Sequence, residues 1–198
     1  GLDLHFQPLT EDRLLRQALD AINSRQPFAL ELRTEAQPPS FIPNWHPTGW
    51  DAANGIATIG HWPNPRVLIV GHGAVVAKLA EQARLWGAEI AIITPDKVLA
   101  DALRQDGFDA VIIGAPTETH ALISDAWTAV VFLFHDHDWE PALIAHALEQ
   151  PHFFLGAMGS KRAHAARCEA LRKRGVSQAA IAGISAPIGV FHSVRDPA

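Results

Sequence analysis

The residues whose types and spacing could do chemistry fall into three short segments, each placed directly after an apolar run. The first segment, Gly71–Ala74, reads Gly-His-Gly-Ala and follows Arg66–Val70. Glycines at the first two positions of a dinucleotide-binding fingerprint allow a tight turn and let backbone N–H groups approach a phosphate. Val76 stands where a third glycine would let a helix pack closely against a strand. The segment predicts a nucleotide- or phosphate-binding turn, with an unliganded turn as the alternative.

The position expected to recognise ribose differs from that of a standard dinucleotide site. Such a site has an acid at the end of its second strand, where the carboxylate binds a ribose hydroxyl. Here Thr94 takes that position, and Asp96 comes shortly after it. We therefore expect either that a short loop brings Asp96 to the ribose or that adenosine is recognised differently.

The second segment is a His-Asp-His loop, His135–His137, that follows the fourth apolar run. Its imidazoles and the nearby carboxylates could bind a metal, move protons or contact a ligand. A zinc site needs three or four convergent ligands, so ligand contact is favoured and no metal site is predicted. The alternative is that Asp138 caps a helix beginning at Trp139 while the histidines are only solvated. The candidates for acid–base catalysis are His135, His137 and Glu140.

The third segment, Gly156–Arg162, reads Gly-Ala-Met-Gly-Ser-Lys-Arg and forms a second glycine turn before a helix. Cations near a helix N-terminus are mildly unfavourable, so Lys161 and Arg162 at this position indicate an anion between them. This interpretation favours contact with a phosphate or a pterin phosphate. The alternative is a solvated basic helix with Ser160 as its N-cap.

The elements that must position these segments alternate in type from Arg66 onward. Apolar runs separated by helical patterns predict an α/β fold with a doubly wound, Rossmann-like, mostly parallel sheet in the order 3-2-1-4-5. In that order the loop after the fourth strand lies beside the first glycine turn. The predicted strands are Arg66–Val70, Glu89–Ile93, Ala110–Ile113, Ala129–Phe134 and His152–Leu155. The predicted helices are Ala74–Leu85, Lys97–Gln105, Glu118–Ala126, Trp139–Glu149 and Lys161–Arg174.

Residues 1–64 lack the regular alternation of strands and helices and predict a short α+β extension. This leaves residues 65–198 as the Rossmann-like domain. Thr10–Arg25 has apolar residues at helical spacing. Phe28–Arg33 alternates as a strand does, and Gly55–Ile59 is a second candidate strand. Between these strands, Gln37–Asn54 is rich in Pro and Trp and predicts a loop.

The composition excludes several classes of protein. A net charge of −5 argues against a general nucleic-acid binder. No apolar run is long enough to span a bilayer, and no secretory signal opens the chain, so a cytoplasmic protein without a membrane partner is expected. The single Cys168 excludes an intrachain disulfide. The absence of Tyr excludes Tyr-dependent mechanisms, including that of the short-chain dehydrogenases.

Together with the later segment Ala186–Gly189 (Ala-Pro-Ile-Gly), these three segments in this order resemble the XdhC/CoxI family. Its members are accessory factors of xanthine dehydrogenase and carbon monoxide dehydrogenase. The resemblance covers Arg66 to the C-terminus, and the joint pattern is more specific than any single motif. The glycine-rich motifs of the family's usual N-terminal domain are not recognisable in residues 1–64. The chain ends where the family continues into a final helix.

The resemblance implies a factor that binds molybdenum cofactor (molybdopterin), assists its sulfuration and inserts it into a xanthine dehydrogenase-type apo-hydroxylase. It also implies a maturation factor without catalytic turnover. A cysteine desulfurase and a second copy of the chain, forming a homodimer, are further candidate partners. The alternatives are an NAD(P)-dependent oxidoreductase and a non-catalytic nucleotide-sensing Rossmann module. The predicted ligand contacts are Gly71, His72, Gly73, Ala74, Thr94, Asp96, His135, Asp136, His137, Gly156, Gly159, Ser160, Lys161 and Arg162.

Overall fold

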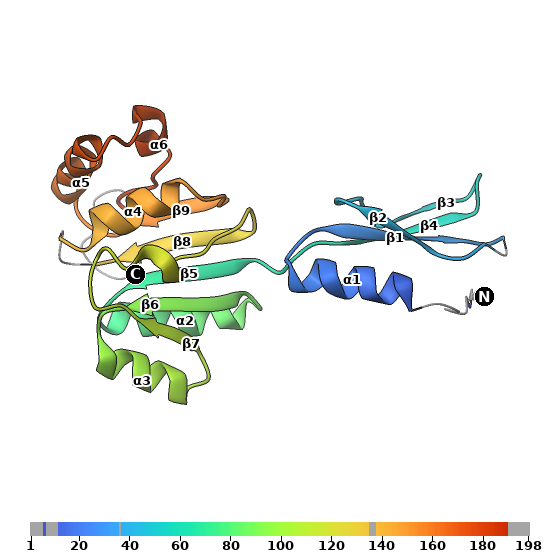
Figure 1. The fold of residues 1–198 in the computed structure, drawn as a ribbon, viewed down its shortest axis with the longest axis horizontal. Coiled ribbons are helices and arrows are strands. Elements are labelled where there is room, and N and C mark those ends of the chain that lie inside the picture. Colours follow the sequence, from blue (N-terminus) through green and yellow to red (C-terminus); the bar gives the residue numbers. More distant parts are fainter. Residues whose placement is uncertain (1–5, 7–11, 36, 135–137, 190–198) are drawn as a thin grey trace. The chain divides into compact units, whose positions relative to one another are not determined.

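The computed structural model describes residue 6 and residues 12–35, 37–134 and 138–189. The chain divides into two compact units, Gly1–Pro63 and Asn64–Ala198, which are labelled by element in Figure 1. The division falls next to the domain boundary predicted from the sequence.

The first unit contains a helix and a four-stranded antiparallel sheet in the order β2-β1-β4-β3. The helix starts later than predicted, with Asp12 at its N-cap. The predicted loop over residues 37–54 is wrong, because this region contains the edge strands β2 and β3. They pair with β1 and β4. Pro43 has no N–H to donate to a ladder, and an edge strand tolerates it for that reason. The elements are α1 (Arg13–Asn23), β1 (Phe28–Arg33), β2 (Ser40–Pro43), β3 (Gly49–Asp51) and β4 (Ile56–His61).

The second unit is a five-stranded parallel sheet with strand order β7-β6-β5-β8-β9, which confirms the predicted Rossmann-like fold and its 3-2-1-4-5 order. Its strands are β5 (Arg66–Gly71), β6 (Glu89–Thr94), β7 (Asp109–Ile112), β8 (Thr128–Leu133) and β9 (Phe154–Ala157). Its helices are α2 (Ala74–Leu85), α3 (Lys97–Gln105), α4 (Glu140–Leu148), α5 (Lys161–Lys173) and α6 (Gln178–Ala182).

The helix predicted over Glu118–Ala126 is wrong, because only the 3-10 turn η1 (Thr119–Ala121) forms there. The chain after this turn is held instead by residues 150–151, in the connection between α4 and β9. The Ser124 N–H donates to Oε1 of Gln150 at 2.8 Å, and its hydroxyl donates to the Pro151 carbonyl at 2.9 Å. These bonds replace the i→i−4 bonds of a helix, so tertiary contacts override the local helical pattern.

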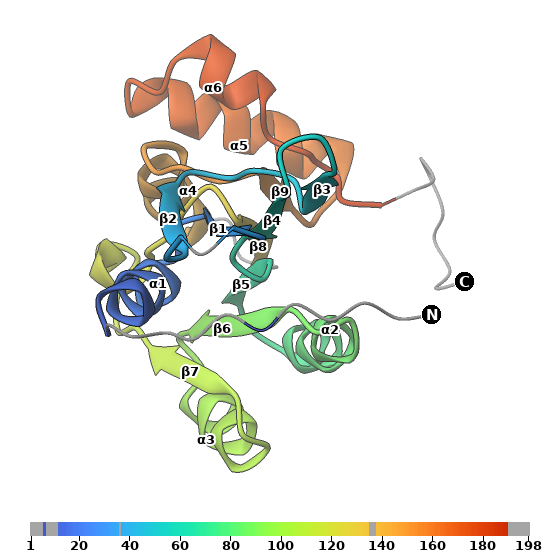
Figure 2. The same cartoon turned by 90° about the vertical axis from the view of Figure 1, so that its right-hand side faces the viewer.

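Helices cover both faces of this sheet (Figure 2), and a cluster of buried side chains lies on each face. On one face, buried residues of α2 and α3, including Ala80 and Leu103, pack with Ile69 and Ile92. On the other face, α4, α5 and α6 bury side chains against β5, β8 and β9; these side chains include Leu143, Ile144, Leu171 and Ile181. Covering both faces explains why β5 and β8 read as continuous apolar runs rather than alternating ones. Because the sheet is packed on both faces, the ends of its strands are held in fixed positions relative to one another.

Candidate functional site

The predicted ligand-binding segments that the structure describes meet at the carboxyl edge of the parallel sheet. Gly71 pairs with Leu133 across β5 and β8, and Phe132 pairs with Ala157 across β8 and β9. Beyond the paired region, the His72 N–H donates to the Leu133 carbonyl at 3.3 Å. The two glycine turns are thus separated by one strand, or about 10 Å. In doubly wound sheets this edge, at the change of strand order, is where ligands bind.

The two glycines of the first turn have different physical roles. A Cβ added at Gly71 would meet the backbone of Leu133 at 2.5 Å, so this glycine lets β5 approach β8. Gly73 is the N-cap of α2 with φ 84° and ψ 177°, a conformation essentially restricted to glycine. A Cβ added at Gly73 would meet nothing within 4 Å. Gly73 therefore faces open space at a helix N-terminus, as a phosphate-binding turn requires.

The remaining residues of the first turn pack differently from one another. The His72 ring lies edge-on to Phe134 with centroids 5.5 Å apart, and Phe134 stacks on Trp139 at 6.1 Å. Ala74 is exposed in the first turn of α2, and Val76 is fully buried. Val76 thus fills the space that a third glycine would leave between helix and strand.

The His-Asp-His loop, His135, Asp136 and His137, lies outside the described residues, so its predicted ligand contacts stay predictions. The helix after it, α4, has Trp139 at its N-cap and no side-chain cap hydrogen bond. The alternative in which Asp138 caps this helix stays a prediction.

The end of β6 uses its polar side chains to build local structure. Thr94 is fully buried, and its hydroxyl accepts the Asp96 N–H at 3.1 Å. The carboxylate of Asp96 accepts the Leu99 N–H at 3.1 Å and caps α3. An Asp at this place is explained by the cap alone. Contact of Thr94 or Asp96 with a ribose stays a prediction.

The second glycine turn connects β9 to α5. Ser160 caps α5 by accepting the Ala163 N–H at 3.1 Å, as its alternative interpretation expected. Lys161 and Arg162 are both exposed in the first turn of this helix. Gly159 has φ 132°, so its backbone conformation is one that L side chains rarely adopt. The turn therefore presents a capped helix N-terminus with two exposed cations, which is suited to an anion.

The Ala-Pro-Ile-Gly segment lies against the same turn. The Ser185 carbonyl accepts the Ala157 N–H at 3.0 Å, and the Ile188 N–H donates to the Ala157 carbonyl at 3.2 Å. A Cβ added at Gly156 would stand 2.6 Å from the Phe154 ring and 2.9 Å from Ile188, so this glycine makes room for both. Gly156 is therefore a packing residue on this evidence.

A buried ion pair beneath the second turn escaped the sequence analysis. Arg167 and Glu140 each have a side chain 1% exposed, and they are joined by two hydrogen bonds of 2.9 and 3.1 Å. The signal was present in the spacing, because Ala163, Arg167 and Leu171 lie on one buried stripe of α5. An arginine on such a stripe is rarely buried without a partner. Glu140 thus has a structural partner, and its predicted acid–base role stays a prediction.

His164 and Cys168 lie next to this ion pair on α5. The Cys168 sulfur is 3.5 Å from His164 Nε2, and the thiol is buried in the core. Burial, and then the nearby positive charge of Arg167, lower the pKa of His164 below its usual 6.5. The neutral imidazole is therefore favoured at this position.

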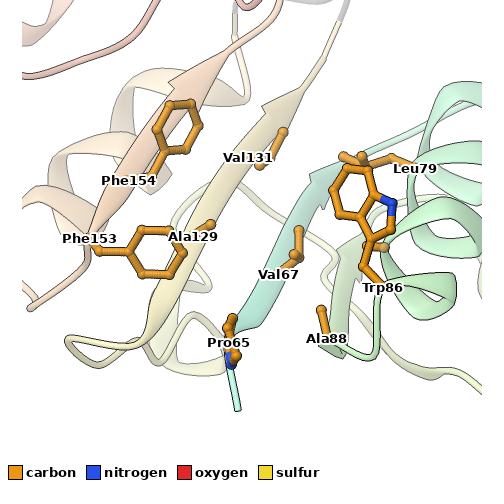
Figure 3. A pocket seen from close by; sticks show the side chains of 10 residues that line it. Pro65, Val67, Leu79, Trp86, Ala88, Ala129, Val131, Phe153 and Phe154 are labelled. Atoms are coloured by element: carbon orange, nitrogen blue, oxygen red, sulfur yellow. The ribbon is translucent and has the colours of Figure 1, made fainter. Parts of the chain in front are cut away.

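A cavity of about 400 Å³ opens on the α2 face of the sheet, near the amino ends of the strands (Figure 3). Trp86 and Phe153 stand on opposite sides of it. Its lining residues carry no titratable side chain, so it has no charged group to orient a ligand. They are Pro65, Val67, Leu79, Ala83, Trp86, Ala88, Ala129, Val131, Phe153 and Phe154. The predicted site is at the other end of these strands.

Within residues 6, 12–35, 37–134 and 138–189, no three His, Cys, Asp or Glu side chains gather so as to hold a metal ion. No helix within the same ranges is both long and apolar enough to cross a membrane.

Comparison with known protein families identifies the family of the chain. The XdhC Rossmann domain matches residues 67–198, which carry both glycine turns and the Ala-Pro-Ile-Gly segment. The chain belongs to the XdhC family. The resemblance inferred from the motifs is confirmed.

Two curated proteins of Escherichia coli (strain K12) are similar over nearly the whole chain. The molybdenum cofactor insertion chaperone PaoD is 32% identical over 197 residues, covering 99% of this chain and 55% of PaoD. The uncharacterized protein YqeB is 24% identical, covering 96% of this chain and 34% of YqeB. The chain thus spans about half the length of the first of these relatives and a third of the second.

A solved structure shares the fold. The crystal structure of a xanthine dehydrogenase (BH1974) from Bacillus halodurans has a TM-score of 0.63 with this chain, covering 89% of this chain and 58% of that one. The identity is 16%, so this likeness supports the architecture alone.

Proposed function

We propose that the chain is an accessory factor that binds molybdenum cofactor as its cargo and assists its sulfuration and insertion into a xanthine dehydrogenase-type hydroxylase. Membership of the XdhC family and the similarity to a molybdenum cofactor insertion chaperone support this proposal. The observation that carries it is the pair of glycine turns at one sheet edge, the second of which has Ser160, Lys161 and Arg162 at the start of a helix.

The described residues fit a cargo with a phosphate. The open space at Gly73 would let a phosphate approach the N-terminus of α2, whose backbone N–H groups would bind it. Lys161 and Arg162 would supply charge-assisted hydrogen bonds to an anionic group at the second turn. His72, whose ring lies edge-on to Phe134, would line the space between them. A pterin with its phosphate would then extend across the end of β8.

The second candidate function, an NAD(P)-dependent oxidoreductase, is less well supported. The carboxylate of Asp96 accepts a helix-capping hydrogen bond, so the acid nearest the standard ribose position has another task. Mass spectrometry of the released ligand, described below, separates nicotinamide binding to the glycine turns from pterin binding.

Co-expression tests the maturation role. The chain, in the full-length form in which it occurs, is expressed with a xanthine dehydrogenase-type apo-hydroxylase, and the activity and molybdenum content of the hydroxylase are measured. We expect Lys161→Ala with Arg162→Ala to lower both at least several-fold. The matched control is Lys173→Ala with Arg174→Ala, which removes two exposed cations from the other end of α5. Equal activation by the two double variants would contradict the proposed site.

The ligand and partners are tested separately. Mass spectrometry of small molecules released from gently purified protein should detect a pterin, whereas a nicotinamide would favour the oxidoreductase. A purified chain that turned over NAD(P)H with a carbonyl acceptor would also contradict the maturation role. Sulfuration requires a sulfur donor, so the chain should also bind a cysteine desulfurase. A pull-down with the tagged chain as bait tests for the desulfurase and for the hydroxylase.

A further inference from the structure

We infer that Arg167 is a positioning residue that sets the backbone of the second glycine turn. Within α5, Nη1 of its guanidinium lies 3.5 Å from Nδ1 of His164. Outside its own helix, the guanidinium bonds three acceptors on two separate elements. Two are the carboxylate oxygens of Glu140 at the start of α4, and the third is the Met158 carbonyl at 2.8 Å. Met158 lies within the turn, immediately before Gly159. One buried side chain therefore ties the first residue of α4 to the turn that precedes α5.

The geometry explains why an arginine is needed. Arg167 lies in the middle of α5, and a helical side chain points back toward the helix N-terminus, which brings the guanidinium under the turn. Its planar fork reaches the carboxylate with Nε and Nη2, while Nη2 also serves the carbonyl. A lysine has a single ammonium group and cannot reproduce this fixed fork. The conformation of the turn thus depends on guanidinium geometry as well as on charge.

The other side of the turn is held by a backbone bond to the sheet. The Met158 N–H donates to the Phe132 carbonyl of β8 at 2.9 Å. Gly159 packs closely against α5, because an added Cβ would lie 3.1 Å from the Ala163 Cβ and 3.6 Å from Nη2 of Arg167. Arg167 therefore sets one side of a turn that the sheet sets on the other.

Stability alone does not explain the ion pair. Charges that are 1% exposed lose most of their hydration, and apolar residues of similar volume can replace such pairs without loss of stability. What apolar residues cannot replace is the directed bond to the Met158 carbonyl. A positioning role and a purely structural role consequently predict different results for a variant that removes both charges.

Amide hydrogen exchange on the full chain distinguishes these roles. In Arg167→Met with Glu140→Leu, we expect urea unfolding close to that of the wild type but exchange at Met158 and Ala163 faster by about tenfold or more. The matched control, Arg66→Met with Glu89→Leu, removes a partly exposed pair at the amino ends of β5 and β6 and should leave exchange at the turn unchanged. Unchanged exchange at Met158 and Ala163 in a folded double variant would overturn the inference.

Arg167→Lys covers the case in which the double variant does not fold. It keeps the positive charge beside Glu140, so folding is retained, yet exchange at Met158 and Ala163 should again accelerate. Wild-type exchange in this variant would show that charge alone suffices, and it would equally overturn the inference.

The anion that this turn would bind comes from the proposed function, so a second measurement tests anion binding separately from the role of Arg167. Inorganic phosphate is titrated while the amide resonances of Gly159, Lys161 and Arg162 are followed. We expect the double variant to bind phosphate about tenfold more weakly than the wild type, with unfolding unchanged. If the wild type showed no response to phosphate, the anion site would fail, while the exchange data would still decide the role of Arg167.

Discussion

The two glycine turns lie one strand apart at the same sheet edge, yet they are built differently. The first turn depends on backbone alone, since Gly71 allows β5 to approach β8 and Gly73 faces open space. The second turn is tied down by side chains, with Ser160 capping α5 and Arg167 bonded to the Met158 carbonyl. One half of the site is therefore set by glycines at the end of a strand, and the other half by a buried ion pair together with the sheet.

This difference has a physical consequence. The conformation of a turn made by glycines is disturbed by substitutions that add a side chain within the turn. The conformation of a turn held by side chains is disturbed by substitutions that remove one of those side chains, even outside the turn. Variants in the second half should consequently affect the site from a distance, through Glu140 and Arg167. Variants in the first half should act only where they are made.

The largest expected effect is the loss of one partner of the ion pair. Arg167→Met alone leaves the Glu140 carboxylate buried without its cation, and breaking such a pair costs about 3–5 kcal/mol of unfolding free energy. Urea denaturation measures this change. Adding Glu140→Leu should recover most of the loss, because no unpaired charge remains. A single variant as stable as the double variant would show that the pair is not buried as the structure has it.

The next largest effect is expected at Gly71. In Gly71→Ala the new methyl group would meet the Leu133 carbonyl at 2.5 Å, and backbone cannot move aside as a side chain can. Overpacking of this kind costs roughly 1–3 kcal/mol, measured by urea denaturation. Amide exchange along β5 and β8 should rise at the same time. If the variant were as stable as the wild type, the close approach of these strands would not depend on glycine.

Gly73→Ala should affect binding more than packing. Its φ of 84° imposes backbone strain of roughly 1–3 kcal/mol on alanine, although the methyl group meets nothing within 4 Å. Gly107→Ala is the control, because Gly107 has φ 79° in equally open space in the connection between α3 and β7. Both variants should lose stability, but only Gly73→Ala should weaken phosphate binding. Equal phosphate affinities in a calorimetric titration would remove the first turn from the site.

Ser160→Ala removes one cap and is expected to cost about 1 kcal/mol in urea denaturation. Ser177 offers a matched comparison, since it caps α6 with the same hydrogen bond, to the Ala180 N–H at 3.2 Å. Ser177→Ala should lower stability similarly while leaving phosphate binding unchanged. Should both serine variants weaken phosphate binding alike, the effect at Ser160 would reflect helix stability rather than the site.

The sequence predicted the fold of the second unit well because its signals were strong and local. Apolar runs such as Arg66–Val70, bounded by turn residues, left little freedom in placing the strands. The strand order is the one typical of doubly wound folds, and the right-handed crossover then fixes the face on which each helix lies. The failures came where distant contacts decide local structure. Residues 37–54 form strands only because β1 and β4 pair with them, and Ser124 leaves the helical pattern for Gln150 and Pro151.

The candidate site was predictable in part for the same reason. Glycine turns and caps are encoded in adjacent residues, so Gly73 and Ser160 could be singled out. The partnership of Glu140 with Arg167 could not, because these residues are far apart in the chain and meet only after α4 and α5 pack. Asp96 shows the opposite case, where a residue considered for a ligand is already used as a helix cap.

The smallest expected effect is a pH dependence of stability at His164, which lies next to the ion pair of the second turn. Burial, followed by the charge of Arg167, holds the pKa of His164 below 6.5, so the unfolded chain takes up a proton there that the folded chain resists. More protons bound in the unfolded state mean that stability falls as pH drops through about 6.5. His164→Gln should therefore show a shallower loss of stability between about pH 7 and pH 5 in urea denaturation. An NMR titration of the His164 ring gives the pKa directly. Because Arg167 is only the second cause, Arg167→Met with Glu140→Leu should raise that pKa part of the way back. A pKa that did not move would mean that burial alone sets it, and that the Arg167 charge is screened from the imidazole.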